Sequence, residues 1–349
     1  MTRINEKQII EIFVNEFKRS SRKGTNYYDN RQYYTARRIG EDDVSIISPV
    51  RRLRRGIELV FKCDMLVESS DVPPGMKAWQ IARKSVVSCV SDFAAKGIRP
   101  PYMSMISLGI PDRYLKDDIL ELVRGFKKSS REFGIEFIGG DTNEASELII
   151  SCALIGFSEN GNIPSRNGAK PGDFIVVSGG FGYPAAGLKI LMQSANAGGM
   201  FKNKAISSVM SPKPQQKFGT SLARYLSSSI DSSDGLAISL YELAIQSKVN
   251  FFVSTVPSAT GIGRFAMENR FLDSHELIFH GGEEFHIVAT VPRQNMKRVE
   301  NIAGKQRLKL IVIGRATHGA GKVFVIGKQN EKKELSLLDN RGYLHLKNE

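Results

Sequence analysis

The chain has 349 residues, a formal net charge of +13, 41% hydrophobic residues and 24% charged residues. This composition excludes the disordered and fibrous classes, the length favours two domains, and the positive charge favours an anionic partner such as a nucleic acid or a phosphorylated small molecule. No apolar run approaches the ~20 residues that a membrane-spanning helix needs and the N-terminal segment has no signal-type apolar block, so a cytoplasmic protein without a membrane segment is expected.

The first half of the chain mixes strands and helices. Apolar residues at helical spacing predict helices over residues 5–17, 77–96 and 112–133. Asp112 is a candidate N-cap, and Gly97 and Gly134 are placed to end the second and third helices. Strands are predicted over residues 44–47, 57–63, 102–110, 135–138 and 148–157. Because strands and helices do not alternate strictly, the first half is predicted to be α+β rather than doubly wound.

A domain boundary is predicted in the segment 161–173, where glycine, proline, asparagine and charged residues replace the apolar runs. A strand over 174–178 follows and leads through the glycine-rich stretch SGGFGYPAAG into a helix. That stretch is interpreted first as a tight strand-to-helix turn and second as a phosphate cradle. The two domains are therefore expected at residues 1–160 and 161–349.

The three cysteines Cys63, Cys89 and Cys152 are odd in number and show no CxxC spacing. In apolar surroundings this pattern predicts buried, reduced thiols rather than a disulfide framework.

Basic residues are concentrated in the tract Lys18–Arg38, where they are interleaved with tyrosines. Cations beside aromatic rings can hold single-stranded nucleic acid. The alternative interpretation, a solvated basic segment leading into the first strand, is favoured.

Several aspartates lie where an apolar segment begins or ends: Asp43, Asp64, Asp92, Asp141, Asp231 and Asp234. Taken singly, each is interpreted as a cap or a surface charge; Asp92, for example, could form a surface pair with Lys96 four residues on. Taken together, they are the oxygen ligands that Mg²⁺ requires, and the predicted helix start near Leu236 could accept a phosphate. No GxxxxGK[ST] loop and no GxGxxG after a clean strand is present, which disfavours P-loop and Rossmann sites.

The motifs resemble one known family. IGEDDVSII, CDMLVE, KSVVSCVSDFAAKGIRP, IGGDTNE, SRNGAKPGDFIVVSG, IDSSDGL, GGEEFHIVATVP and VIGRATHGAG follow the order and approximate spacing of the thiamine-monophosphate kinases, from about Ile39 to Tyr343. The resemblance implies an aminoimidazole-ribotide-synthetase-like fold, with an N-terminal α+β domain whose strands form a barrel across a homodimer and a C-terminal α/β domain. It also implies transfer of the γ-phosphoryl group of ATP, with Mg²⁺, to thiamine monophosphate.

The resemblance assigns roles to individual positions. The implied metal ligands are Asp43, Cys63, Asp64, Asp92, Asp141, Asp231 and Asp234, with Cys63 standing where the family has threonine. The implied nucleotide contacts are Gly140, Asp141, Arg166 and Ser233, and the implied acceptor contacts are Asp71, Glu283 and Tyr343. Asp43, Asp92, Asp141 and Asp231 are the implied catalytic residues. Phosphoryl transfer to a phosphate needs charge neutralisation and alignment rather than a protein nucleophile, so the five histidines need no catalytic role.

Three departures from the family pattern concern the acceptor side. Asp71 stands near the place of a histidine, Cys89 replaces an asparagine, and Glu284 replaces an aspartate. Two alternatives therefore stay open. One is another ATP-dependent enzyme of the superfamily, acting on a carbonyl or on a different phosphorylated molecule. The other, less favoured, is a nucleic-acid-binding protein that uses the basic tract.

Overall fold

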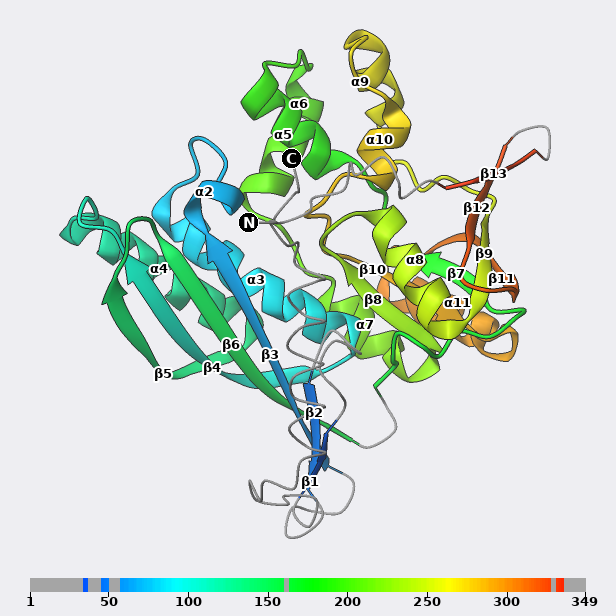
Figure 1. Cartoon of the computed structure of the whole chain (residues 1–349), viewed down its shortest axis with the longest axis horizontal. Coiled ribbons are helices and arrows are strands. Elements are labelled where there is room, and N and C mark those ends of the chain that lie inside the picture. Colours follow the sequence, from blue (N-terminus) through cyan, green and yellow to red (C-terminus); the bar gives the residue numbers. More distant parts are fainter. Residues whose placement is uncertain (1–33, 37–44, 50–56, 160–162, 328–330, 336–349) are drawn as a thin grey trace, which may run out of the picture.

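The computed structural model describes residues 34–36, 45–49, 57–159, 163–327 and 331–335. Two sheets with helices packed against them make up a mixed α/β fold (Figure 1). Several features predicted from the sequence lie outside the described residues: Asp43, Tyr343, the helix over 5–17 and all of the basic tract except 34–36. The boundary between residues 160 and 161 stays a prediction.

The first sheet has the strand order β1-β2-β3-β6-β4-β5. Its strands are β1 (Tyr34–Ala36), β2 (Ser45–Pro49), β3 (Ile57–Val67), β4 (Arg99–Ile110), β5 (Ile135–Glu144) and β6 (Ile149–Glu159). The β4–β5 pair is parallel and the other pairs are antiparallel. The helices of this part are α2 (Glu68–Asp71), α3 (Ala78–Ala95) and α4 (Lys116–Phe133).

One face of this sheet is covered by helices and the other is open. Val60, Cys152 and Leu154 are buried in the same hydrophobic cluster as Val90 and Phe93 of α3. On the other face Met65 is 65% exposed and Met105 is 46% exposed. The first sheet therefore has a filled core on one side and an apolar surface on the other.

The Gly139-Gly140-Asp141 segment follows the predicted strand over 135–138, but in the structure it lies in the middle of β5, which is longer than predicted. It pairs in parallel with β4, with a register shift after Phe137. A Cβ atom at Gly140 would lie 1.8 Å from the carbonyl oxygen of Ile106, so the close approach of the two strands explains a glycine there. The glycines thus allow a tight strand pair rather than a change of direction.

The predicted helix ends are confirmed, but one predicted start is wrong. Gly97 and Gly134 follow α3 and α4 with φ of 71° and 69°. Helix α4 begins at Lys116 rather than after Asp112, and its first turn is capped by Asp118, whose Oδ2 accepts a hydrogen bond from the Leu115 N–H at 2.9 Å. The start of α4 is therefore stabilised by Asp118, which lies inside the first turn, rather than by Asp112, which precedes the helix.

The second sheet has the order β13-β12-β9-β11-β7-β10-β8. Its strands are β7 (Phe174–Val177), β8 (Ser228–Ser232), β9 (Val249–Val253), β10 (His286–Val291), β11 (Ile311–His318), β12 (Val323–Ile326) and β13 (Lys332–Glu334). Only the β12–β9 pair is parallel among these described strands. Helices and strands do mix here as expected, but the pairing is mainly antiparallel.

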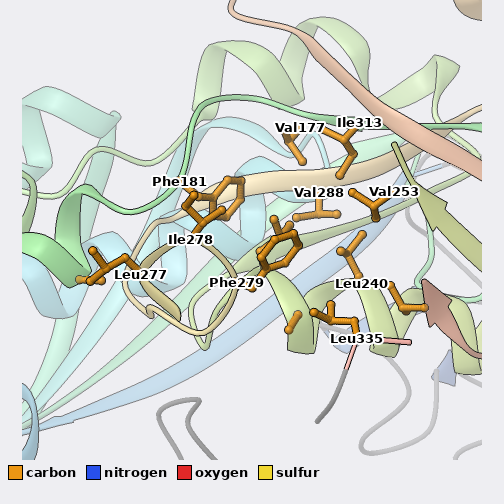
Figure 2. Packing of buried hydrophobic residues seen from close by; sticks show 14 of the residues in the cluster. Val177, Phe181, Leu240, Val253, Leu277, Ile278, Phe279, Val288, Ile313 and Leu335 are labelled. Atoms are coloured by element: carbon orange, nitrogen blue, oxygen red, sulfur yellow. The ribbon is translucent and has the colours of Figure 1, made fainter. Parts of the chain in front are cut away.

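Helices cover both faces of the second sheet. They are α5 (Tyr183–Gln193), α6 (Gly199–Met210), α7 (Gln216–Leu222), α8 (Leu236–Ser247), α9 (Ile262–Glu268), α10 (Ser274–Phe279) and α11 (Met296–Gln306), with short 3₁₀ turns at Ala223–Tyr225 and Arg293–Asn295. Phe181, Leu240 and Phe279 pack with Val253 and Val288 on one face (Figure 2). The glycine-rich stretch forms the expected turn between β7 and α5.

Helix α3 connects the two hydrophobic cores. Its middle packs on the first sheet, while Ala94 and Ala95 at its end lie in a cluster with Val176 and Ile287 of the second sheet. Figure 1 shows α3 running from the first sheet toward α7. Side chains near the end of α3 therefore lie where the two sheets meet.

No helix in the described ranges is long and apolar enough to cross a membrane. The three cysteines are free, and Cys89 and Cys152 are buried as expected. Cys63 is exposed, contrary to expectation, because it lies on the open face of β3.

Candidate active site

Two of the predicted metal-ligating aspartates share one cation. The Nζ atom of Lys62 lies 3.0 Å from Asp64 Oδ1 and 2.9 Å from Asp92 Oδ2. Lys62 and Asp64 are two residues apart on β3, so both face α3, where Asp92 is 5% exposed. Burial alone would lower the pKa of Lys62, but the charges of Asp92 and Asp64 outweigh it and raise that pKa well above its usual range.

Asp231 belongs to the same charged cluster. It lies on β8, is 7% exposed, and its charge also raises the pKa of Lys62. Two aspartates, from β3 and α3, therefore contact the ammonium group, and the charge of a third, on β8, acts on it. The aspartates were predicted from the sequence, but Lys62 was not. Lys62 lies two residues before Asp64 on a strand, and this spacing could have indicated that both side chains point to the same face.

The predicted surface pair between Asp92 and Lys96 is wrong as a surface feature, because both residues are buried. Lys96 is 0% exposed, and its Nζ donates a hydrogen bond to the Ser229 carbonyl oxygen at 2.6 Å. Lys96 thus ties the end of α3 to β8, and Lys62 forms the ion pair with Asp92.

Three buried side-chain oxygens in the described residues have no hydrogen-bond partner: Ser91 Oγ, Ser232 Oγ and Glu283 Oε2. Ser91 precedes Asp92, Ser232 follows Asp231, and the Glu283 N–H donates to the Ser233 carbonyl oxygen. Because neighbouring residues of a strand point to opposite faces, the Ser232 hydroxyl lies on the other side of β8 from the Asp231 carboxylate.

Two predicted acceptor contacts are joined by a lysine. Lys84 of α3 is 5% exposed; its Nζ donates to the Asp71 carbonyl oxygen at 2.6 Å and forms an ion pair with Glu283 Oε1. The Asp71 carboxylate accepts a hydrogen bond from the Val67 N–H at 2.7 Å. Lys84 was missed by sequence reasoning, because its helical position gives no sign that it reaches residue 283.

The fold of a single chain does not bring Asp141, Gly140 or Cys63 to the charged cluster around Lys62. Asp141, Ser107, Ser151 and Met65 are paired in this order across strands β5, β4, β6 and β3, so they form one row on one face of the sheet. This row faces away from α3. Three interstrand steps also separate β5 from β3, about 14 Å. Cys63 lies on the same open face, 3.4 Å from Ser151 Oγ.

The remaining predicted contacts lie in the second half of the chain. Arg166 Nη1 lies 4.0 Å from Glu242 Oε2, and the Arg166 carbonyl oxygen accepts a hydrogen bond from Ser247 Oγ at 3.1 Å. Ser233 and Asp234 form the turn before α8, with Ser233 exposed and Asp234 half-buried. Helix α8 begins at Leu236 as predicted.

The glycine-rich turn covers a buried carboxyl group. Glu284 accepts a hydrogen bond from the Gly182 N–H at the start of α5, and burial raises its pKa to about 8. His286 Nε2 lies 3.7 Å from Glu284 Oε2, and burial lowers the pKa of His286 to about 4. Both groups are therefore neutral at neutral pH.

Among the described residues, no group of three or more His, Cys, Asp or Glu side chains is arranged to hold a metal ion by itself. The donor chemistry nevertheless suits a hard cation, because Asp64 and Asp92 already converge on one positive charge and Asp231 adds a third carboxylate to the same field. These residues fit a metal-phosphate group, with Lys62 as the cation that it would displace or join.

Comparison with known proteins places this chain in a family. A model described as AIR synthase related protein, N-terminal domain, matches residues 41–158. A thiamine-monophosphate kinase of Nitrosopumilus maritimus (strain SCM1) is 37% identical over 350 residues, which cover 99% of this chain and 100% of that protein. This chain belongs to the thiamine-monophosphate kinase family.

Two further relatives agree. A thiamine-monophosphate kinase of Pyrococcus horikoshii is 30% identical over 99% of this chain and 98% of its own length. A solved structure of AaThiL complexed with AMPPCP and TMP has a TM-score of 0.77, covering 98% of this chain and 99% of that chain at 23% identity. The latter shows a shared fold. The family resemblance inferred from the motifs is therefore confirmed.

Proposed function

We propose that this chain transfers the γ-phosphoryl group of ATP to thiamine monophosphate, yielding thiamine diphosphate and ADP, with Mg²⁺. Family membership at 37% identity over nearly the full length supports the reaction. The structural observation that carries it is the convergence of Asp64 and Asp92 on Lys62, whose pKa the charge of Asp231 also raises.

In this proposal the metal is held by Asp64, Asp92 and Asp231, and when bound it neutralises the charge of the transferred phosphate. Lys62 lies beside it and holds the carboxylates in place before ATP binds. Asp43 and Asp234 remain proposed ligands.

The acceptor is proposed to bind near Lys84. Its ammonium group already joins α2 to the loop before β10 through Asp71 and Glu283, and a monophosphate is an anion that such a group attracts. The acceptor phosphate is ionised at neutral pH, so no base is needed to activate it. Alignment by Lys84 and exclusion of water by the adjoining loop are therefore what the chain must supply.

Two of the departures from the family pattern lie in buried contacts. Cys89 Sγ donates to the Cys152 carbonyl oxygen at 3.1 Å, and Glu284 is covered by the glycine-rich turn. We propose that these two residues adjust packing behind the acceptor site and do not change the acceptor.

The homodimer is proposed from the open face of the first sheet. Met65 and Met105 are exposed there, beside Cys63 and the row that carries Asp141. A second copy placed against this face would bury the apolar surface, continue the sheet into a barrel, and cover the row that carries Asp141. The catalytic site is then shared between two chains, and Gly140 and Asp141 act on the nucleotide bound by the partner.

A panel of phosphorylated acceptors with ATP and Mg²⁺ tests the reaction. We expect ADP release with thiamine monophosphate to exceed that with every other acceptor, and the product mass to be that of thiamine diphosphate. Equal or greater turnover with a different phosphate ester, or with an amine and a carbonyl substrate, would contradict the proposal.

Mixing two inactive variants tests the shared site. In a mixture of Asp92→Asn and Asp141→Asn chains, a site built from two chains is intact once in every mixed dimer, which restores about a quarter of the wild-type sites after random exchange. A site contained in one chain gives no recovery. The same mixture made with two Asp92→Asn preparations is the control.

A cytoplasmic location is part of the proposal. It is supported by the three free thiols, which a reducing compartment preserves.

A further inference from the structure

Helix α4 carries a basic stripe that the proposed function does not use. Arg124, Lys127, Lys128 and Arg131 are exposed and spaced three, four and seven residues apart, so they lie on one face. No ion pair joins these four residues to a carboxylate in the described part of the chain. Like charges at this spacing repel one another and destabilise a helix. A bound anion would reduce this repulsion.

The stripe forms one wall of a hollow of about 720 Å³. The opposite wall is the segment after α6, where Lys213 follows Pro212. Six cations line the hollow, namely Arg83, Arg124, Lys127, Lys128, Arg131 and Lys213, with Glu132 as the single carboxylate.

The base of the hollow is built before any ligand arrives. Arg83 is 2% exposed and binds both carboxylate oxygens of Glu132, with Nε–Oε2 and Nη2–Oε1 distances of 2.8 and 2.7 Å. Its Nη1 donates to the Pro212 carbonyl oxygen at 2.8 Å. The only carboxylate of the hollow is therefore already neutralised, and the same guanidinium fixes the wall that carries Lys213.

The shape and lining favour a compact polyanion over an extended nucleic acid. Single strands are held by aromatic faces on which bases stack, and no aromatic side chain lines this hollow in the described residues. Trp79 lies below the stripe, but the Lys128 ammonium covers its ring at 4.2 Å from the centroid. Four cations on α4 with Lys213 on the segment after α6 match several phosphates on a small molecule.

We propose that this hollow binds a compact molecule with two or more linked phosphate groups, at a site separate from the catalytic cluster. Arg83 and Lys84 are neighbours on α3, but Lys84 points to Glu283 and Arg83 points to the hollow. The two sites therefore lie on different sides of α3, and the proposal does not depend on the acceptor of the reaction.

The chain contains its own reporter for this site. Trp79 is the single tryptophan of the sequence, and a ligand that draws Lys128 away from its ring should change its emission. Inorganic tripolyphosphate is the probe, titrated into the full chain with EDTA present so that no metal ion holds it among the catalytic carboxylates. Calorimetry measures binding, and Trp79 fluorescence locates it.

We expect saturable binding that weakens as salt is added, with a matching change in Trp79 emission. In the triple variant Arg124→Gln, Lys127→Gln, Arg131→Gln the affinity should fall at least ~tenfold, because three of the six cations are lost. The matched control is Arg293→Gln, Lys297→Gln, Lys305→Gln, which removes the same charge from exposed positions around α11 and should leave binding unchanged.

Four results would overturn the proposal. They are no calorimetric binding to the wild-type chain, binding without a change in Trp79 emission, equal weakening in both triple variants, and preferential binding of a single-stranded RNA oligomer that the stripe variant alone loses. The last result would assign the hollow to nucleic acid. The stripe residues are exposed, so a circular dichroism spectrum like that of the wild type is expected for both variants.

Discussion

Acidic side chains on the two faces of the first sheet differ in their exposure and in their pairing with cations. On the helix-covered face Asp92 and Asp64 are held by one ammonium group, because a buried carboxylate without a cation is costly. On the open face Asp141 is exposed, and Met65 and Met105 on the same face are exposed as well. The comparison teaches that Asp64 and Asp92 are held by a cation of their own chain, while Asp141 lies on the face where the homodimer is proposed.

Asp92→Asn should have the largest effect, because it removes both a proposed metal ligand and a charge that Lys62 needs. We expect turnover to fall at least ~100-fold. The free energy of unfolding should fall by about 2 kcal/mol, since the hydrogen bond to a charged group is weakened while Asp64 still holds Lys62. ADP release and urea denaturation measure the two effects. Asp117→Asn, at an exposed position of α4, is the control, and full activity in Asp92→Asn would refute the cluster as the site.

Asp141→Asn should lose as much activity with almost no loss of stability. The side chain is exposed, so the free energy of unfolding should stay within about 0.5 kcal/mol of the wild type. The same two measurements apply. A variant that is destabilised as strongly as Asp92→Asn would show that the two faces do not differ as described.

Met105→Lys tests the partner directly. A lysine at this 46% exposed position should raise the dimer dissociation constant at least ~tenfold, because its charge would be buried against the second copy. Light scattering during gel filtration measures the mass. Met267→Lys, at a 75% exposed position on α9, should leave the dimer intact. An unchanged dimer in Met105→Lys would place the interface elsewhere.

Glu284→Gln should have the smallest effect on activity and a distinct effect on pH dependence. Glu284 is buried without an ammonium group, and its pKa of about 8 in the folded chain exceeds its ordinary value near 4.5. The folded chain therefore binds more protons than the unfolded chain between these values. This contribution to stability is fully present below about pH 4.5 and is lost as the pH rises through about 8.

The measurement is the free energy of unfolding between pH 6.5 and 8, a window in which His286 stays neutral when folded. The wild type should lose stability relative to Glu284→Gln by up to ~1.4 kcal/mol per pH unit. Glutamine keeps an oxygen for the Gly182 N–H. Parallel curves for the two proteins would show that Glu284 is ionised when folded.

Local signals were sufficient for many elements and for the family. Apolar spacing located α3, and a glycine with positive φ ended it as predicted, because a helix end depends on a few neighbouring residues. The motif aspartates were also recognisable, since each lies at the end of an apolar segment. In contrast, the predicted strand over 135–138 ended too early. The glycines that follow it are part of the strand, because Ile106 on the neighbouring strand leaves no room for a side chain at Gly140.

The amino-acid sequence by itself therefore determined the family and the approximate place of many helices and strands. Only the tertiary structure decided that Lys62 lies between Asp64 and Asp92, that Lys84 reaches Glu283, and that Asp141 faces the other way. The physical reason is that periodicity and capping act over a few residues. The meeting of charges depends on strand register and on how α3 packs between the two sheets, which no short stretch of sequence specifies.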